Sequence, residues 1–243
     1  HRPLPVTVMT LAHQLAAYTA WRSRLSANIG EFKAWLADNE LSDAQSDLRL
    51  NQLLERLRED RLNVAFVAEF SRGKSELINA IFFADYGNRI LPSSAGRTTM
   101  CPTELLYDPD KTPRIELLPI QTRAANGSVS EYKRYPEEWF MVPLDVESAD
   151  VMQEALRHVS ETIRVMPDEA GRLGFEVGAD DLYRVGDDGL VEIPRWRHAL
   201  INFPHPLLKQ GLVILDTPGL NAIGTEPELT LNMLPSAHAV LFL

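Results

Sequence analysis

The stretch VAFVAEFSRGKSELINAI, which runs from Val64 to Ile81, decides the fold of this protein. It begins with the apolar run of a buried strand, passes through a polar loop around Gly73, and continues as an amphipathic helix with Leu77, Ile78 and Ile81 expected inward. A loop in this position faces the unpaired N–H groups and the positive dipole end of the helix, both of which favour an anion. The stretch therefore predicts a loop that binds phosphate.

Residues 68–75 follow the phosphate-loop pattern G-x-x-x-x-G-K-[ST], except that Ala68 replaces the first glycine. Gly73 lets the backbone approach a phosphate, Lys74 can reach the β- and γ-phosphates, and the Ser75 hydroxyl can ligate Mg²⁺. Alanine at position 68 costs about 1–2 kcal/mol if a positive φ is needed there, and little otherwise. The residues expected around the nucleotide here are Ala68, Glu69, Phe70, Ser71, Arg72, Gly73, Lys74, Ser75 and Glu76.

Two later stretches narrow the class of nucleotide-binding protein. The buried strand LVILDTPG ends with Asp216, whose carboxylate can hold Mg²⁺ through water, and Gly219, whose N–H can meet a γ-phosphate. The loop GRTTMCPT offers a threonine as the metal's other protein ligand, and Thr98 and Thr99 are adjacent in it. In chain order these are the phosphate loop, the first switch and the second switch of a GTPase. The metal ligands predicted from these stretches are Ser75, Asp216 and a threonine of this loop.

Short buried strands alternate with helices along the chain, which predicts an α/β fold with a mainly parallel sheet flanked by helices. Strands are expected at NVAFVAEF, TELLY, RIELLPI, GLVILD and HAVLFL. Residues 1–60 are expected to form an N-terminal helical segment in which Ser42 or Asp43 caps the second helix. Two interpretations of this segment stay open. It is either an appendage packed on its neighbour or part of a helical bundle whose other members lie beyond Leu243.

Residues 61–243 are expected to form the nucleotide-binding domain, with an acidic insertion at about 121–210. Between Glu131 and Glu192 there are 16 acidic and 6 basic residues, a difference equal to the whole net charge of −10. This charge would repel nucleic acid, so no nucleic-acid partner is expected. Most of the insertion should be surface. Its one good helix is expected to bury the face formed by Val151, Ala155, Val159 and Ile163.

The composition excludes several other classes of protein. The chain has 243 residues, of which 45% are hydrophobic, and its single cysteine, Cys101, rules out an internal disulfide and favours a reducing compartment. No stretch approaches the ~18 consecutive apolar residues that span a bilayer, and no signal peptide is visible. The chain does not begin with Met, so we expect a fragment of a cytoplasmic protein whose contact with any membrane is peripheral.

In the stretches VAEFSRGKSELINAI, LPSSAGRTTMCPTELLY and GLVILDTPGLNAI, the chain resembles the dynamin superfamily, and most closely the bacterial dynamin-like GTPases. The resemblance is specific over roughly residues 63–118 and 198–243. It implies binding of GTP and GDP with Mg²⁺, and hydrolysis of GTP by attack of water on the γ-phosphate. It also implies nucleotide-dependent pairing of GTPase domains, coupled to membrane remodelling through helical parts mostly outside this chain.

Residue by residue, the resemblance places Lys74 and Ser75 on phosphate and Mg²⁺, and it matches Thr99 to the switch threonine of T-x-x-P. Ser71 matches a phosphate-loop serine that dynamins use near the bridging oxygen and a monovalent cation. Arg72 and Arg97 lie beside the expected triphosphate, where an arginine either offsets transition-state charge or is an ordinary surface residue. The implied catalytic set is Lys74, Ser71, Thr99, Gly219 and Arg72.

The chain departs from the family pattern in two places. Phe70 stands where dynamins carry a glutamine that positions the attacking water, and a phenyl ring cannot hydrogen-bond water. The guanine-reading motif T/N-K-x-D is expected after Leu243, so the preference for guanine rests on the resemblance. Two alternatives therefore stay open. One is a nucleotide-binding scaffold or interaction module with little turnover, which Phe70 favours, and the other is a phosphate-loop ATPase.

Overall fold

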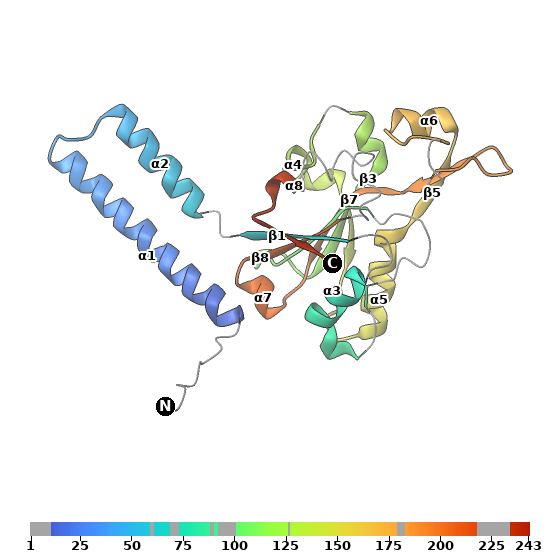
Figure 1. Cartoon of the computed structure of the whole chain (residues 1–243), viewed down its shortest axis with the longest axis horizontal. Coiled ribbons are helices and arrows are strands. Elements are labelled where there is room, and N and C mark those ends of the chain that lie inside the picture. Colours follow the sequence, from blue (N-terminus) through green and yellow to red (C-terminus); the bar gives the residue numbers. More distant parts are fainter. Residues whose placement is uncertain are drawn as a thin grey trace, which may run out of the picture.

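The computed structural model of the protein describes residues 11–58, 61–68, 73–87, 90–91, 101–125, 127–178, 183–217 and 234–243. A seven-stranded sheet carries helices on both faces, and a pair of long helices lies beside it (Figure 1). The predicted α/β class with flanking helices is confirmed.

The two long helices are α1 (Leu11–Asp38) and α2 (Ala44–Arg58). The Asp43 carboxylate accepts hydrogen bonds from the backbone N–H groups of Gln45 and Ser46, at 2.9 and 2.8 Å, so Asp43 caps α2 as predicted. Aromatic side chains on α1 are about half exposed and stack in two pairs, Tyr18 with Trp21 and Phe32 with Trp35. The position of residues 1–60 in a larger bundle stays a prediction.

The order of strands in the sheet is β4-β3-β7-β2-β8-β1-β9. The strand β1 lies parallel to β8 and to β9, and β2 is parallel to β7. The pairs β2–β8, β3–β7 and β3–β4 are antiparallel, so the parallel arrangement holds for three of the six pairs. The strands are β1 (Leu62–Val67), β2 (Thr103–Leu106), β3 (Arg114–Pro119), β4 (Phe140–Pro143), β7 (Trp196–Asn202), β8 (Leu212–Asp216) and β9 (Ala239–Phe242).

Two apolar cores cover the two faces of this sheet. The first packs under α3 (Lys74–Phe82), α5 (Ala149–Arg157) and α7 (Pro206–Lys209). The second packs under α4 (Val129–Tyr132) and α8 (Leu234–Ser236), on the other side of the sheet in Figure 1. A third core joins α6 (Pro167–Arg172) to a small antiparallel sheet of β5 (Thr162–Val165) and β6 (Val191–Pro194). Short 3-10 helices cover residues 84–86, 120–124, 136–138 and 158–160.

The stretch predicted as an insertion contributes to the main sheet. Both β4 and β7 lie within 121–210, and every residue of β7 is buried. The predicted buried face of its helix is wrong in part. Val151 is 47% exposed, the helix ends at Arg157, and Ile163 belongs to β5. Burial falls instead on Met152, Ala155, Leu156 and Val159.

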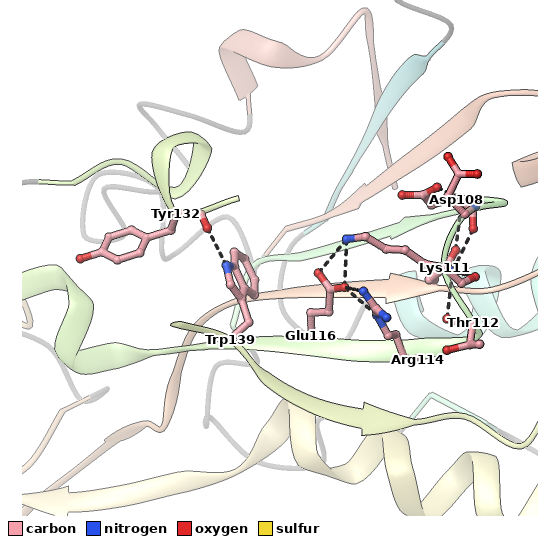
Figure 2. Close-up of polar contacts among 9 residues, drawn as sticks. Asp108, Lys111, Thr112, Arg114, Glu116, Tyr132 and Trp139 are labelled. Atoms are coloured by element: carbon pink, nitrogen blue, oxygen red, sulfur yellow. Dashed lines mark hydrogen bonds and ion pairs between the residues drawn. The ribbon is translucent and has the colours of Figure 1, made fainter. Parts of the chain in front are cut away.

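Polar side chains hold the start of β3 (Figure 2). The Glu116 carboxylate accepts from Lys111 Nζ at 3.0 Å and from Arg114 Nε at 2.7 Å. The Asn202 amide of β7 donates to three backbone carbonyls of the turn before β3, those of Asp108, Lys111 and Thr112. Since these bonds satisfy the backbone of the turn, they fix the register between β3 and β7.

A second, more buried charge cluster lies on the α4 side of the sheet. The Glu104 carboxylate of β2 contacts His198 Nε2 at 2.9 Å and accepts from Lys133 Nζ at 2.7 and 2.9 Å. Burial by itself raises the pKa of Glu104, but the hydrogen bonds and charges of His198 and Lys133 outweigh burial and lower that pKa from 4.5 to about 2. The cluster therefore favours the ionised carboxylate.

This cluster predicts a specific acid sensitivity. Because the pKa of Glu104 is lower in the folded state, its stabilisation is fully present above about pH 4.5 and is lost as the pH falls towards 2. Full protonation of Glu104 should lower the free energy of unfolding by about 3 kcal/mol. We expect Glu104→Gln to remove this part of the pH dependence, as measured by urea unfolding at stepped pH. The exposed Glu137→Gln is the matched control, and a Glu104→Gln variant with the wild-type dependence would contradict the assignment.

Candidate functional site

A strand and a helix flank the predicted phosphate loop, as expected. The strand β1 ends at Val67, and α3 begins at Lys74 with Gly73 as its N-cap. Gly73 adopts the left-handed conformation, with φ 87° and ψ 12°. A Cβ built at Gly73 would meet no atom within 4 Å, so glycine is required here for its backbone conformation.

Ala68 is accommodated without backbone strain. It is buried, with 1% of its surface exposed, at the end of β1. Among the described residues, Glu40 is the one non-glycine residue with a positive φ, so Ala68 does not adopt the conformation that a Cβ penalises. The alanine at the first position of the pattern therefore costs little.

Lys74 and Asp216 lie together although they are far apart in the sequence. Asp216 is the last residue of β8, in parallel register with Phe66 of β1. The Lys74 Nζ lies 2.7 Å from Asp216 Oδ1, and the side chains are 15% and 9% exposed. The carboxyl ends of two adjacent parallel strands meet at one edge of a sheet, which is where α/β proteins bind ligands. Lys74 of the predicted phosphate loop and Asp216 of the predicted second switch thus meet there.

The donor atoms at this edge fit a divalent cation. Asp216 Oδ1 is buried and makes no hydrogen bond of acceptable geometry, so its contact with Lys74 is an ion pair alone. An anionic oxygen without a hydrogen-bond donor suits a hard cation such as Mg²⁺. Ser75 is partly buried in the first turn of α3, one residue beyond Lys74. Glu76 follows it and is exposed.

The side chain of Asn79 joins α3 to Ile90 and Leu91, a few residues before the predicted first switch. Asn79 is buried, and its amide donates to Leu91 O at 3.1 Å. Its carbonyl oxygen accepts from the N–H groups of Ile90 and Leu91, at 3.1 and 2.8 Å. Ile81, predicted inward, is instead 37% exposed. Asn79 was not among the predicted site residues. The feature of the sequence that could have indicated its role is its position as a polar residue among the apolar residues of LINAIFF.

The chain is held again where the first-switch stretch rejoins the sheet. Cys101 is buried, and its Sγ donates to Val159 O at 3.6 Å. Thr103 Oγ1 donates to Cys101 O at 2.9 Å, and Pro102 O accepts from Ala199 N of β7 at 3.0 Å. The residues that flank 92–100 on both sides are therefore bonded to the core.

Several predicted site residues lie outside the described part of the chain: Glu69, Phe70, Ser71, Arg72, Arg97, Thr98, Thr99 and Gly219. Their roles stay predictions. Within the described ranges there is no group of three or more His, Cys, Asp or Glu residues placed to hold a metal ion. No helix in the described ranges is long and apolar enough to cross a membrane.

Comparisons with known proteins agree on one family. The model of the dynamin family matches residues 64–243. A bacterial dynamin-like protein of Nostoc punctiforme is 23% identical over 186 residues, which cover 76% of this chain and 20% of that protein. The chain thus spans about a fifth of the length of this curated relative.

Two solved structures are also similar to the chain. Both are described as an oligomerised bacterial dynamin pair that provides a mechanism for the long-range sensing and tethering of membranes. One is 21% identical with a TM-score of 0.40 and covers 79% of this chain and 22% of the other. The second is 16% identical with a TM-score of 0.45 and covers 93% and 28%, respectively.

Proposed function

The chain belongs to the dynamin family, and from that premise we propose that it is the GTPase part of a dynamin-like enzyme that binds and hydrolyses GTP with Mg²⁺. The observation that carries the proposal is the 2.7 Å contact between Lys74 Nζ and Asp216 Oδ1. That contact joins a phosphate-loop lysine to a second-switch aspartate in one site. Residues 61–243 form the GTPase domain in this proposal, with the acidic stretch at about 121–210 inserted in it and residues 1–60 in a helical bundle.

The triphosphate binds at the N-terminus of α3. The backbone N–H groups of its first turn and the left-handed Gly73 provide donors for phosphate oxygens. Lys74 exchanges its carboxylate partner for the β- and γ-phosphates. The loop residues 68–76 surround the phosphates, with Ser71 near the bridging oxygen.

The residues that hold the metal are Ser75, Thr99 and Asp216. Mg²⁺, when bound, supplies positive charge to the β- and γ-phosphate oxygens. The main chain of Gly219 donates to the γ-phosphate, and Arg72 neutralises charge on the reacting oxygens. Water attacks the γ-phosphate, and GDP and inorganic phosphate leave.

Membership of the dynamin family supports two further parts of the proposal. The GTPase domains associate with one another when nucleotide is bound, as homodimers or larger oligomers. The full-length protein works in the cytoplasm and contacts a membrane surface from there. A second function, a nucleotide-binding scaffold with little turnover, is favoured by Phe70, and a phosphate-loop ATPase is the remaining alternative.

Nucleotide competition tests the proposal. We expect the full-length protein with Mg²⁺ to bind GTP at least about tenfold more tightly than ATP, a difference of about 1.4 kcal/mol. Each nucleotide displaces a fluorescent GTP analogue, and GDP is the control for the guanine base. Equal affinity for ATP and GTP would overturn the GTPase assignment in favour of an ATPase.

A further inference from the structure

The hydroxyl of Thr217 links the two strands that carry the site. Thr217 directly follows Asp216 at the end of β8 and is 1% exposed. Its Oγ1 donates a hydrogen bond of 2.7 Å to Phe66 O of β1. Phe66 and Asp216 are the last residues of the two strands to pair in register. The side-chain bond therefore continues the connection between β1 and β8 one residue further.

Beyond this point the two strands lead to different parts of the site. The strand β1 continues to Ala68 and the phosphate loop, whereas β8 ends at Asp216. On its other side Asp216 pairs with Thr103 of β2, at the end of the first-switch stretch. The bond from Thr217 to Phe66 O thus ties the end of β8, which carries Asp216, to the end of β1, the strand that leads towards α3 and Lys74.

We propose that Thr217 is a positioning residue for the phosphate and metal site, acting through its hydroxyl bond to Phe66 O to hold Asp216 beside Lys74 at the start of α3. This inference rests on the proposed function. The neighbours that orient metal ligands change metal affinity by about 10- to 100-fold when they are removed. Because the Thr217 hydroxyl is buried and bonded to Phe66 O, its loss should act through the position of Asp216 and fall on the Mg²⁺ requirement more than on the affinity for nucleotide itself.

The test compares Thr217→Val, which keeps the shape and loses the hydroxyl, with Thr217→Ser, which keeps the hydroxyl. The full-length protein binds a fluorescent GTP analogue at stepped Mg²⁺ concentrations and again in EDTA, and the melting temperature is recorded. The matched control is Thr122→Val, because Thr122 Oγ1 donates to Pro119 O over the same 2.7 Å away from the site. If Thr217→Val does not fold, Thr217→Cys takes its place, because the cysteine thiol is similar in size to the lost hydroxyl and is a poor hydrogen-bond donor.

We expect Thr217→Val to need about tenfold more Mg²⁺ for half-maximal GTP binding, with affinity in EDTA changed less than about twofold. Thr217→Ser should return to the wild-type Mg²⁺ requirement, and Thr122→Val should lower the melting temperature alone. A wild-type Mg²⁺ requirement in Thr217→Val, or the same change in Thr122→Val, overturns the inference while the proposed function stands. A wild-type protein that binds no GTP with Mg²⁺ overturns both.

Discussion

Lys74→Ala is expected to weaken GTP binding by the full-length protein at least about a hundredfold. The substitution removes hydrogen bonds from an ammonium to charged phosphate oxygens, which contribute about 1.5–3 kcal/mol each. The affinity is measured by calorimetric titration with GTP and Mg²⁺. Unchanged affinity would remove residues 68–75 from the nucleotide site.

The same substitution has a second consequence that the sequence did not indicate. Lys74 is 15% exposed and pairs with Asp216. Removing it leaves a buried carboxylate without a counter-charge, which should cost about 2 kcal/mol of unfolding free energy, less than for a fully buried pair.

A double variant separates binding from stability. Lys74→Ala/Asp216→Asn replaces the unpaired carboxylate with a neutral amide, so we expect it to recover most of the lost stability while GTP binding stays lost. Urea unfolding of the single and double variants measures this difference. Equal instability in both variants would mean that the ion pair does not carry the effect of Lys74.

The sequence predicted the centre of the site because the centre is local. A strand, a glycine that needs a left-handed conformation and a lysine at a helix start are all visible in one run of residues. The order of the motifs also predicted that Lys74 and Asp216 serve one nucleotide site, whereas the ion pair between their side chains is known only from the structure.

The parts that were missed depend on contacts between distant residues. Asn79 is buried because it forms hydrogen bonds with the backbone groups of Ile90 and Leu91. The sequence of α3 does not show which groups its side chain will contact. The Glu104 carboxylate is partly buried, and its partners His198 and Lys133 come to it from other elements. A polar residue in an apolar run marks such a site, but its partner is known only from the fold.

The directions of the strands were also beyond the sequence. A buried strand reads as apolar whether its neighbour is parallel or antiparallel, so the antiparallel pairs of β2 with β8 and of β3 with β7 left no signal. The strand β7 was not predicted either, because the polar residues of WRHALIN do not fit the pattern of a buried strand. Arg197 and His198 are nevertheless buried, and both have hydrogen-bond partners. The parallel part, β9-β1-β8, is the part that carries the phosphate loop.

Turnover per molecule is expected to rise with protein concentration. Phe70 cannot align the attacking water by hydrogen bonding, so another group must do so if the protein hydrolyses GTP. The candidates are the main chain near Gly219, the main chain of Thr99, and a group from a facing GTPase domain. The proposed pairing of GTPase domains favours the facing domain, because pairing across the nucleotide would complete the site only in the dimer.

Arg72 and Arg97, which are predicted to lie beside the triphosphate, should show the largest effect on this rate. An arginine that reaches the transferring phosphate contributes on the order of 10³ or more in rate. We therefore expect Arg72→Ala or Arg97→Ala to lower turnover by about that factor at high protein concentration, with GTP affinity much less changed. The exposed Arg134→Ala is the control and should keep the wild-type rate.

Steady-state hydrolysis by the full-length protein over a wide concentration range separates enzyme from scaffold. A rate per molecule that rises with concentration and falls in an arginine variant is the result expected of a site completed by a partner. A measurable rate that stays flat per molecule would show that each domain aligns its own water, so that the main chain of Gly219 or Thr99 suffices. Tight GTP binding without turnover at any concentration would favour the scaffold, because Phe70 would then stand in a site that binds nucleotide and has no means to orient water.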